Sequence, residues 1–291
     1  MRLLSDYLEA LENPKGIFKT LKGEISLERD DYNEIKISSG ADACVFKIFL
    51  EGKPLMLKCY VNELAFLCYK YDFLSKLSCP YLVNYRYLAD EITVFDRLGR
   101  SNVREALVGD WLEGETLADV IEWAVKCKDK AKIGELAESF DAMAKYLLAQ
   151  NWAHGDIKPE NIIVLECDNS LKLIDLDSAF IPGLDAGDNI HLGTPPFVHP
   201  GRGVSDYDRH IDDYSLLVIS VSLHGLSFDE SLYLRFHKGD NIILNPEEIF
   251  DNSSEVYNIL LGMWRENIKF TAKLKALRSP SYIIDNLKEL F

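Results

Sequence analysis

Residues Ala153 to Asn161 read Ala-His-Gly-Asp-Ile-Lys-Pro-Glu-Asn, and they indicate the fold more clearly than any other part of the chain. Apolar residues at helical spacing over 132–150 precede it, and the apolar run Ile162–Leu165 follows it at once. A second apolar run, Leu171–Ile174, comes after a short turn and leads into Asp175 to Asp177. This order of loop, strand, turn, strand and acidic end is the strongest signal in the chain.

The side chains of this stretch suit the transfer of a phosphoryl group. The Asp156 carboxylate can orient a hydroxyl group and accept its proton, and Lys158 can neutralise charge on a phosphate. The amide of Asn161 and the carboxylate of Asp175 supply the hard oxygen ligands that Mg²⁺ prefers. A lone His-x-Asp would more simply cap a turn, but these residues in order between predicted strands favour a catalytic site.

These motifs resemble those of the protein kinase family. His154 to Asn161 is similar to its catalytic loop, His-Arg-Asp-Leu-x-x-x-Asn, with Gly155 in place of the arginine. Asp175 to Asp177 is similar to Asp-Phe-Gly with its last two residues changed. Because Gly155 removes an arginine that reads activation-loop phosphorylation, we expect an activity that does not wait for such a phosphate. Asp177 is either an auxiliary Mg²⁺ ligand or a solvated loop residue.

The resemblance implies a fold and a set of roles. The expected fold is the two-lobed α+β protein-kinase-like fold, with a small antiparallel β-sheet lobe and a large, mainly helical lobe. Asp156 would be the catalytic base and Lys158 the phosphate stabiliser, while Asn161 and Asp175 would bind Mg²⁺. His154 would have a structural role in the loop.

Two segments further along resemble the same family. Gly193 to Pro200, Gly-Thr-Pro-Pro-Phe-Val-His-Pro, looks like the end of an activation segment. Gly201 then replaces the usual glutamate, so we expect the buried salt bridge of that glutamate to be absent. Asp212 to Leu216 resembles the start of the hydrophobic central helix of the large lobe, with Asp212 bracing the catalytic loop. The apolar stretch that follows predicts a buried helix.

The upstream matches concern the nucleotide. Ser38 to Val45 resembles the glycine-rich loop but keeps only one glycine, Gly40, so it is a looser cradle for phosphates. Leu55 to Lys58 resembles the Val-Ala-Ile-Lys strand, which would place Lys58 on the α- and β-phosphates. By position in the resemblance, Val45 from above and Ile163 from below would enclose the adenine, although both could be plain core residues.

Residues 107–112 resemble the strand and hinge that hold adenine, which makes Asp110 and Leu112 candidate nucleotide-binding residues. Gly109 would then stand at the gatekeeper position and leave a roomy back pocket.

The resemblance also implies an ion-pair partner for Lys58. Glu63 is the best candidate, although it follows the lysine sooner than the family pattern would have it. An alignment on Ser78 to Tyr81 puts Lys70 at the expected place, which cannot serve, and Asp72 is a third option.

The spacing of the apolar residues changes near residue 113, from short runs typical of β-strands to patterns typical of helices. We expect an N-terminal extension at 1–33, a small lobe at 34–112 and a large lobe at 113–291, with a cleft at the junction. Predicted helices cover residues 4–12, 62–77, 117–126 and 132–150, and predicted strands cover 35–37, 44–50, 55–60, 82–88, 104–111, 162–165 and 171–174. Ser38 to Gly40 and Glu51 to Pro54 are expected to be turns, and Glu113 to Glu115 a connector.

Composition limits the partners and the compartment. The 291 residues include 32 Lys and Arg against 47 Asp and Glu, a formal charge of −15, which disfavours nucleic acid or an anionic membrane as partner. No apolar run reaches the roughly 20 residues of a membrane helix, and the acidic N-terminal segment does not resemble a signal peptide. The six scattered cysteines are expected to be reduced core thiols. These features favour a soluble, cytoplasmic protein.

The function most favoured is ATP- and Mg²⁺-dependent phosphoryl transfer to Ser or Thr hydroxyls of an unidentified protein substrate, as in bacterial Ser/Thr protein kinases. Lys158-Pro159-Glu160 and Gly193 to Pro200 carry that preference. His-Gly-Asp followed by Ile-Asp-x-Asp also resembles aminoglycoside and choline kinases, so a small-molecule kinase is an alternative. A pseudokinase that binds a nucleotide or a partner without transfer is another.

Overall fold

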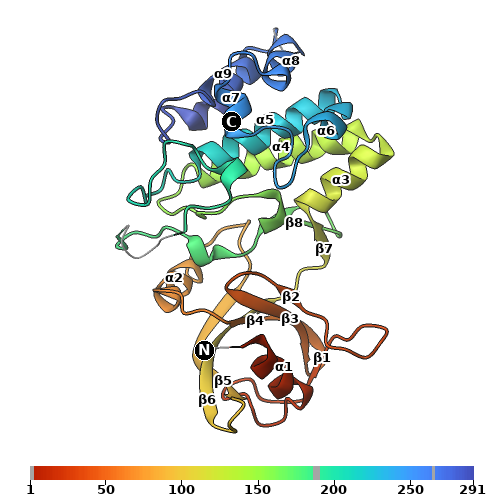
Figure 1. The fold of residues 1–291 in the computed structure, drawn as a ribbon, viewed down its shortest axis with the longest axis vertical. Coiled ribbons are helices and arrows are strands. Elements are labelled where there is room, and N and C mark those ends of the chain that lie inside the picture. The colour runs from red at the N-terminus through yellow and green to blue at the C-terminus, as the bar shows by residue number, and fades with distance from the viewer. Residues whose placement is uncertain (1–2, 186–190, 264–265) are drawn as a thin grey trace. The chain divides into compact units, whose positions relative to one another are not determined.

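The computed structural model describes residues 3–185, 191–263 and 266–291, and its chain divides into two compact units. Met1–Cys79 and Val83–Leu112 form unit 1, and Pro80–Leu82 and Glu113–Phe291 form unit 2. Figure 1 traces both units, with the strands of unit 1 in red to yellow and the helices of unit 2 in yellow-green to blue. The expected α+β fold with an antiparallel sheet and a mainly helical part is confirmed.

Unit 1 is built on an antiparallel sheet whose described strands run in the order β1-β3-β4-β6-β5, with β2 also paired to β3. Two helices accompany the sheet. The elements are α1 Leu4–Glu12, β1 Ile25–Leu27, β2 Ser38–Ser39, β3 Ala43–Leu50, β4 Lys53–Tyr60, α2 Leu67–Leu74, β5 Tyr85–Phe95 and β6 Ser101–Asp110.

The central hairpin β3–β4 explains the register of the sheet. Glu51 and Gly52 connect the strands, both with positive φ (51° and 78°), the backbone that matches the twist of a two-residue hairpin. Alternate residues of β3 point into the core, where Phe46 and Ile48 are fully buried. This register pairs Val45 with Lys58 across the two strands.

Several predicted boundaries in this region were wrong. The strand expected at 35–37 is a single bridge from Ile35 to Arg29, and the pairing with β3 occurs instead at Ser38–Ser39. The turn predicted at Ser38 to Gly40 lies instead between Gly40 and Ala43, where the Gly40 amide donates to the Ala43 carbonyl at 2.9 Å. Because the closing hydrogen bond is made at Gly40, the two serines before it remain available to the sheet.

The N-terminal segment 1–33 is part of unit 1. Helix α1 has the predicted bounds, and its apolar face, with Tyr7, Ala10 and Leu11, belongs to the same core cluster as Phe46 of the sheet. The Tyr7 hydroxyl also donates to the Tyr60 carbonyl at 2.8 Å. The segment therefore packs on the sheet rather than standing apart from it.

A buried carboxylate ties this segment to β5. Glu91 is fully buried, and its oxygens accept hydrogen bonds from the Thr20 amide (2.9 and 3.0 Å), the Thr20 hydroxyl (2.7 Å) and the Leu21 amide (2.7 Å). The Glu91 carbonyl accepts a further bond from the Lys19 amide at 2.9 Å. A carboxylate that accepts several hydrogen bonds from one loop is one of the stronger anchors available to that loop.

Replacing Glu91 with alanine is expected to lower the free energy of unfolding of unit 1 by about 3 kcal/mol. The change leaves the amide of buried Leu21 without its acceptor, which costs about 1–3 kcal/mol, and it also removes the hydrogen bonds from exposed Thr20. Urea denaturation followed by tryptophan fluorescence measures the loss. The matched control is Asp90→Ala on the same strand. Asp90 is exposed, and its ion pair with exposed Lys19, at 3.7 Å, contributes little to stability. Equal losses in both variants would contradict the anchoring role.

Unit 2 is mainly helical and carries a small sheet in the order β7-β8-β9. Helix α5 is buried along most of its length, as its apolar sequence predicts. The described elements are β7 Gly114–Thr116, α3 Leu117–Cys127, α4 Lys130–Leu147, η1 Pro159–Asn161, β8 Ile162–Leu165, β9 Leu171–Leu173, η2 Leu176–Ser178, η4 Pro195–Phe197, α5 Asp213–Phe228, α6 Ser231–Phe236, α7 Pro246–Phe250, α8 Glu255–Met263, α9 Ile268–Ala276 and η5 Leu287–Leu290.

The connector predicted at 113–115 is largely strand β7, which pairs with β8. Gly114 permits the close approach, since a Cβ there would come within 2.2 Å of the Val164 carbonyl oxygen. Among the described residues, none of the helices has the length and apolar character needed to cross a membrane. The six cysteines, all within the described residues, form no disulfide, but only Cys44 and Cys59 are buried, so the expectation of core positions was wrong for Cys68, Cys127 and Cys167, which are exposed.

Candidate active site

The predicted catalytic loop is a tightly bonded unit that leads into β8. Pro159 starts the single turn η1, and the Asn161 amide nitrogen donates to the Lys158 carbonyl at 3.0 Å. The side-chain amide of Asn161 donates to the Asp156 carbonyl (2.9 Å) and to Asp156 Oδ2 (3.1 Å). Two residues that the sequence assigned to proton transfer and to metal binding therefore lie in direct contact.

His154 joins this loop to the residue before Asp175. The Asp156 amide donates to His154 Nδ1 at 3.3 Å, so the ring proton is assigned to Nε2, which donates to the Ile174 carbonyl at 2.9 Å. The Ile174 amide in turn donates to the Asn161 carbonyl at 3.0 Å. The ring of His154 therefore connects the catalytic loop to the backbone from which Asp175 follows.

Asp175 itself is exposed and has a left-handed backbone, with φ of 60°. This conformation costs a non-glycine residue about 1–2 kcal/mol, and such strain is held only where the surroundings determine it, most often at functional sites. Asp177 lies half-buried in η2, the turn that follows.

Asp212 braces the loop from the first turn of α5. Its two oxygens accept the backbone amides of His154 and Gly155, the latter at 2.9 Å. Burial raises the pKa of the Asp212 carboxyl, and the hydrogen bonds from the backbone amides of His154 and Gly155 offset part of that rise. Its position at the N-terminus of the helix also favours a negative charge.

The glycine that replaces the expected arginine has a structural cause. Gly155 has φ of +84°, and a Cβ at this position would come within 2.2 Å of the Ser178 carbonyl oxygen. Glycine therefore allows the loop to approach the backbone after Asp175, where no L side chain fits without a shift.

Thr194 is a site residue that the sequence analysis did not select. Its hydroxyl donates to Asp156 Oδ1 at 3.0 Å, so Asp156 is held by Asn161 on one oxygen and by Thr194 on the other. The Lys158 ammonium lies 3.9 Å from Asp156 Oδ2. The Gly-Thr-Pro motif indicates only which segment this is. No neighbouring residue in the sequence indicates that the Thr194 side chain points toward Asp156.

The same segment is held by a buried cation. Arg202 Nη1 donates to the Leu192 carbonyl at 3.0 Å, next to Gly193 and Thr194. Burial lowers the pKa of Arg202, whereas the negative charge of Asp212 opposes that shift. A cavity of about 10 Å³, the size of one water, lies between Asp156, Arg202 and Asp212.

The candidate nucleotide residues of unit 1 lie on the central hairpin. Val45 and Lys58 are direct cross-strand partners, which places their side chains on one face of the sheet. Lys58 is buried, and its ammonium lies 5.5 Å from the centre of the Tyr60 ring. Gly40 closes the turn before β3. In unit 2, Ile163 lies on β8, paired with Lys172.

At the end of β6, Asp110 accepts hydrogen bonds from Asn84 and Lys53, both at 3.1 Å, and the bond from Asn84 is the main cause of its lowered pKa. Leu112 is half-buried at the end of unit 1. The expectation of a roomy pocket at Gly109 was wrong. Its cross-strand partner Tyr85 fills the space, since a Cβ at Gly109 would lie 2.7 Å from Tyr85 Cδ1.

Glu63 is not on a helix, in contrast to the prediction of a helix from residue 62. The amides of Val61 and Asn62 both donate to the Asp42 carbonyl, which keeps the chain on the β2–β3 turn. Phe66 then has a left-handed backbone, and α2 begins only at Leu67. Glu63 is exposed on the stretch before the helix.

The two alternatives to Glu63 lie on α2 itself. Lys70 is a residue of α2 that is buried, with 2% of its surface exposed. Asp72 is exposed and forms a 2.6 Å ion pair with Lys76.

The donor set in unit 2 fits a magnesium ion. The NH₂ group of Asn161 points to Asp156, so its amide oxygen is the atom that remains to ligate, and Asp175 adds a carboxylate. In the part of the chain that the structure describes, no three His, Cys, Asp or Glu side chains gather into a metal cage. Mg²⁺ is ordinarily held by one or two carboxylates together with phosphate oxygens, which these residues would allow.

Comparison with known proteins agrees with this geometry. The family model described as "Protein kinase domain" matches residues 34–268, which include the catalytic loop, Asp175 and Lys58. MAP kinase-activated protein kinase 2 of Cricetulus longicaudatus is 25% identical over 183 residues, which are 58% of this chain and 54% of that protein. The chain thus spans about half the length of this curated relative.

Proposed function

Since this chain belongs to the protein kinase family, we propose that it transfers the γ-phosphoryl group of ATP to Ser or Thr hydroxyls of a protein substrate. The observation that carries the proposal is the setting of Asp156, which contacts Asn161 and Thr194 and lies near Lys158. The Lys158-Pro159-Glu160 sequence supports the Ser/Thr assignment over the small-molecule alternative.

Asp156 would act as the base. With its oxygens oriented by Asn161 and Thr194, it would align the attacking hydroxyl and take its proton. Lys158 would neutralise charge on the phosphoryl group in transfer. Mg²⁺, when bound through Asn161 and Asp175, neutralises phosphate charge and orients the phosphates. These groups supply positioning and electrostatic stabilisation, the two things that phosphoryl transfer chiefly needs.

The residues of unit 1 would bind the nucleotide. Lys58 would contact the α- and β-phosphates, with Glu63 as its proposed ion-pair partner, and Gly40 would let backbone amides approach the phosphates. Val45 of unit 1 and Ile163 of unit 2 are the residues proposed to contact the adenine. Asp110 and Leu112 complete the proposed nucleotide-binding set. In this scheme, 34–112 and 113–291 are the small and large lobes.

The experiment is transfer of labelled γ-phosphate from ATP–Mg²⁺, offered to the protein itself, to a generic Ser/Thr protein substrate and, separately, to a pool of small-molecule alcohols. Label on Ser or Thr of protein supports the proposal, and label confined to the alcohols replaces it with a small-molecule kinase. Binding of ATP–Mg²⁺ with no transfer to any acceptor would favour a pseudokinase.

Treatment with a phosphatase before the assay is expected to leave the activity unchanged, because Gly155 stands where an arginine that binds the activation-loop phosphate would be.

A further inference from the structure

Two adjacent carboxylates at the start of α5 face different parts of unit 2. Asp212 holds the catalytic loop, as described above, whereas Asp213 holds the segment after α9. Asp213 Oδ2 accepts the Ile284 amide and His210 Nδ1, each at 3.1 Å, and only 1% of Asp213 is exposed. Burial raises the pKa of Asp213 to about 6, and these two hydrogen bonds offset part of that rise.

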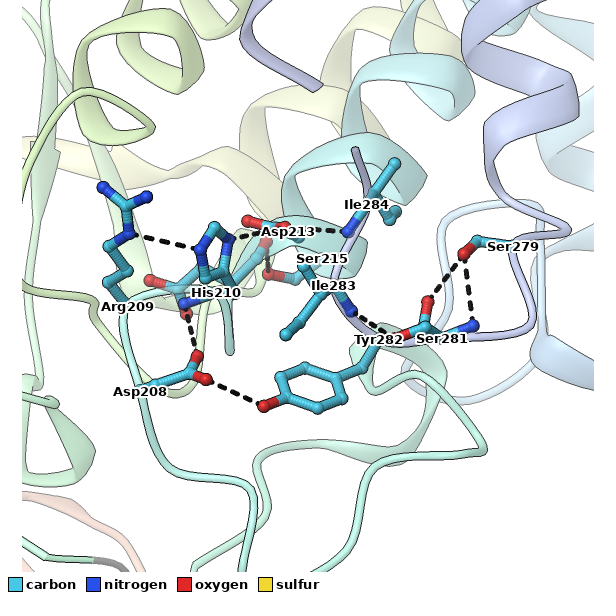
Figure 2. A network of polar contacts seen from close by, with 11 residues as sticks. Asp208, Arg209, His210, Asp213, Ser215, Ser279, Ser281, Tyr282, Ile283 and Ile284 are labelled. Carbon is cyan, nitrogen blue, oxygen red and sulfur yellow. Dashed lines mark hydrogen bonds and ion pairs between the residues drawn. The ribbon is translucent and has the colours of Figure 1, made fainter. Parts of the chain in front are cut away.

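The segment Ser279–Ile284 also reaches the turn before α5. Figure 2 shows the Tyr282 hydroxyl pointing to Asp208, where it donates to Oδ2 at 2.8 Å. The other oxygen of Asp208 accepts the His210 amide at 2.7 Å. Asp208 therefore connects Tyr282 to the same histidine that donates to Asp213, and the network closes on itself.

A third contact holds the stretch after Thr194. The Gly201 amide donates to His199 Nδ1 at 3.0 Å, so the ring proton lies on Nε2, which donates to the Ser279 carbonyl at 3.0 Å. Three contacts from six consecutive residues thus fix positions 199, 208 and 213, which lie 71 to 80 residues earlier in the chain.

From these contacts we propose that Ser279–Ile284 is a positioning element for the catalytic loop. It fixes the turn from Asp208 to Asp213 and thereby the Asp212 carboxylate that holds the amides of His154 and Gly155. Tyr282 is the positioning residue whose single hydroxyl contributes most directly to this turn. The catalytic role of the loop rests on the proposed function, but its positioning does not.

The physical reason is that the position of the Asp212 carboxylate depends on the residues beside it in the chain. It lies between His210, whose carbonyl accepts the Asp213 amide, and Asp213, which is bonded to Ile284. Loosening either neighbour lets the carboxylate of Asp212 rotate or shift. Displacements of about 1 Å at a reacting centre can lower a rate by a factor of about 100.

The test is the variant Tyr282→Phe, compared with Tyr257→Phe. Both remove one hydroxyl donor to an oxygen acceptor, but the acceptor of Tyr257 is the Leu274 carbonyl of α9, whereas that of Tyr282 is Asp208 in the turn before α5. Amide hydrogen exchange of the full chain is measured without nucleotide over the peptide that contains His154 and Gly155. Tyr282→Phe is expected to speed this exchange about tenfold, the factor that corresponds to one hydrogen bond to a charged group. Tyr257→Phe is expected to leave it unchanged.

Exchange at wild-type rates in Tyr282→Phe, or an equal rise in Tyr257→Phe, would overturn the proposal. Asp208→Asn leaves one acceptor oxygen for two donors, the Tyr282 hydroxyl and the His210 amide, so it is also expected to speed the exchange and serves as the test if Tyr282→Phe proves too unstable to measure. Where phosphoryl transfer is found, Tyr282→Phe should lower kcat and leave the KM for ATP unchanged. Because exchange needs no activity, a chain that transfers no phosphate still tests the positioning.

Discussion

Replacing Asp156 with asparagine is expected to lower the rate of phosphoryl transfer by about 10²- to 10⁴-fold, the usual contribution of a general base. Asparagine has nearly the same shape and keeps one acceptor oxygen, so the Thr194 hydroxyl can still donate to position 156, whereas the hydrogen bond from the side-chain amide of Asn161 is lost. It cannot take a proton at neutral pH. The loss should therefore fall on kcat, with unfolding of unit 2 little changed, and steady-state kinetics beside thermal unfolding separate the two effects.

The matched control is Asp168→Asn on the turn between β8 and β9. Asp168 is an exposed aspartate whose Oδ1 accepts the Ser170 amide at 2.9 Å. An asparagine there keeps that acceptor, so we expect wild-type kinetics. A chain with Asp156→Asn that transfers phosphate at the wild-type rate would show that the base lies elsewhere.

The parts of the site that sequence reasoning predicted well are those determined by local order. The loop, β8 and β9 follow one another within about twenty residues, and each is specified by its own apolar run and turn residues. Asn161 and Asp156 are five residues apart in the loop that leads into β8, and the single turn η1 brings them into contact. The contacts of Asp212 with the loop also agree with the resemblance, because the buried helix α5 has a strong apolar signal of its own.

The parts that failed depend on contacts between distant segments. The start of α2 is delayed because Val61 and Asn62 bond to Asp42, twenty residues earlier, which outweighs the helical spacing of the following leucines. The space at Gly109 is filled by a residue of the neighbouring strand, Tyr85, which no property of Gly109 itself predicts. Thr194 and Tyr282 reach their partners across 38 and 74 residues in the same way.

Unit 2 also depends on a polar network inside its helices that the sequence did not reveal. Asp141 of α4 accepts hydrogen bonds from Ser220 Oγ (2.6 Å), from His224 Nε2 (3.0 Å) and from the Lys273 ammonium (2.6 Å). Lys273 of α9 also donates to Ser220 Oγ at 2.8 Å, and only 3% of its side chain is exposed. The network joins α4, α5 and α9, and it lies apart from the catalytic loop.

The charges of this network are mutually dependent. Burial alone would raise the pKa of Asp141, but the bond from His224 and the charge of Lys273 hold it below its usual value. Burial lowers the pKa of Lys273, and Asp141 opposes that shift. Since the pKa of Asp141 is lower in the folded state, its stabilising contribution is present above about pH 4, the ordinary carboxyl pKa, and is lost as the pH falls through the folded value.

Asp141→Ala is therefore expected to lower the free energy of unfolding of unit 2 by about 3–5 kcal/mol at neutral pH, because it leaves the Lys273 charge buried without its counter-ion. Guanidinium denaturation at pH 7 measures the loss. The double variant Asp141→Leu with Lys273→Met should recover most of it, since no buried charge remains. Glu122→Ala, which breaks an exposed ion pair with Lys126, serves as the control and should change the free energy of unfolding little.

As the pH is lowered below about 4, the difference in the free energy of unfolding between wild type and Asp141→Ala should shrink, because the protonated aspartate no longer pairs with Lys273. A difference that stays constant across that range would mean that Asp141 stabilises the helices by packing and not by its charge.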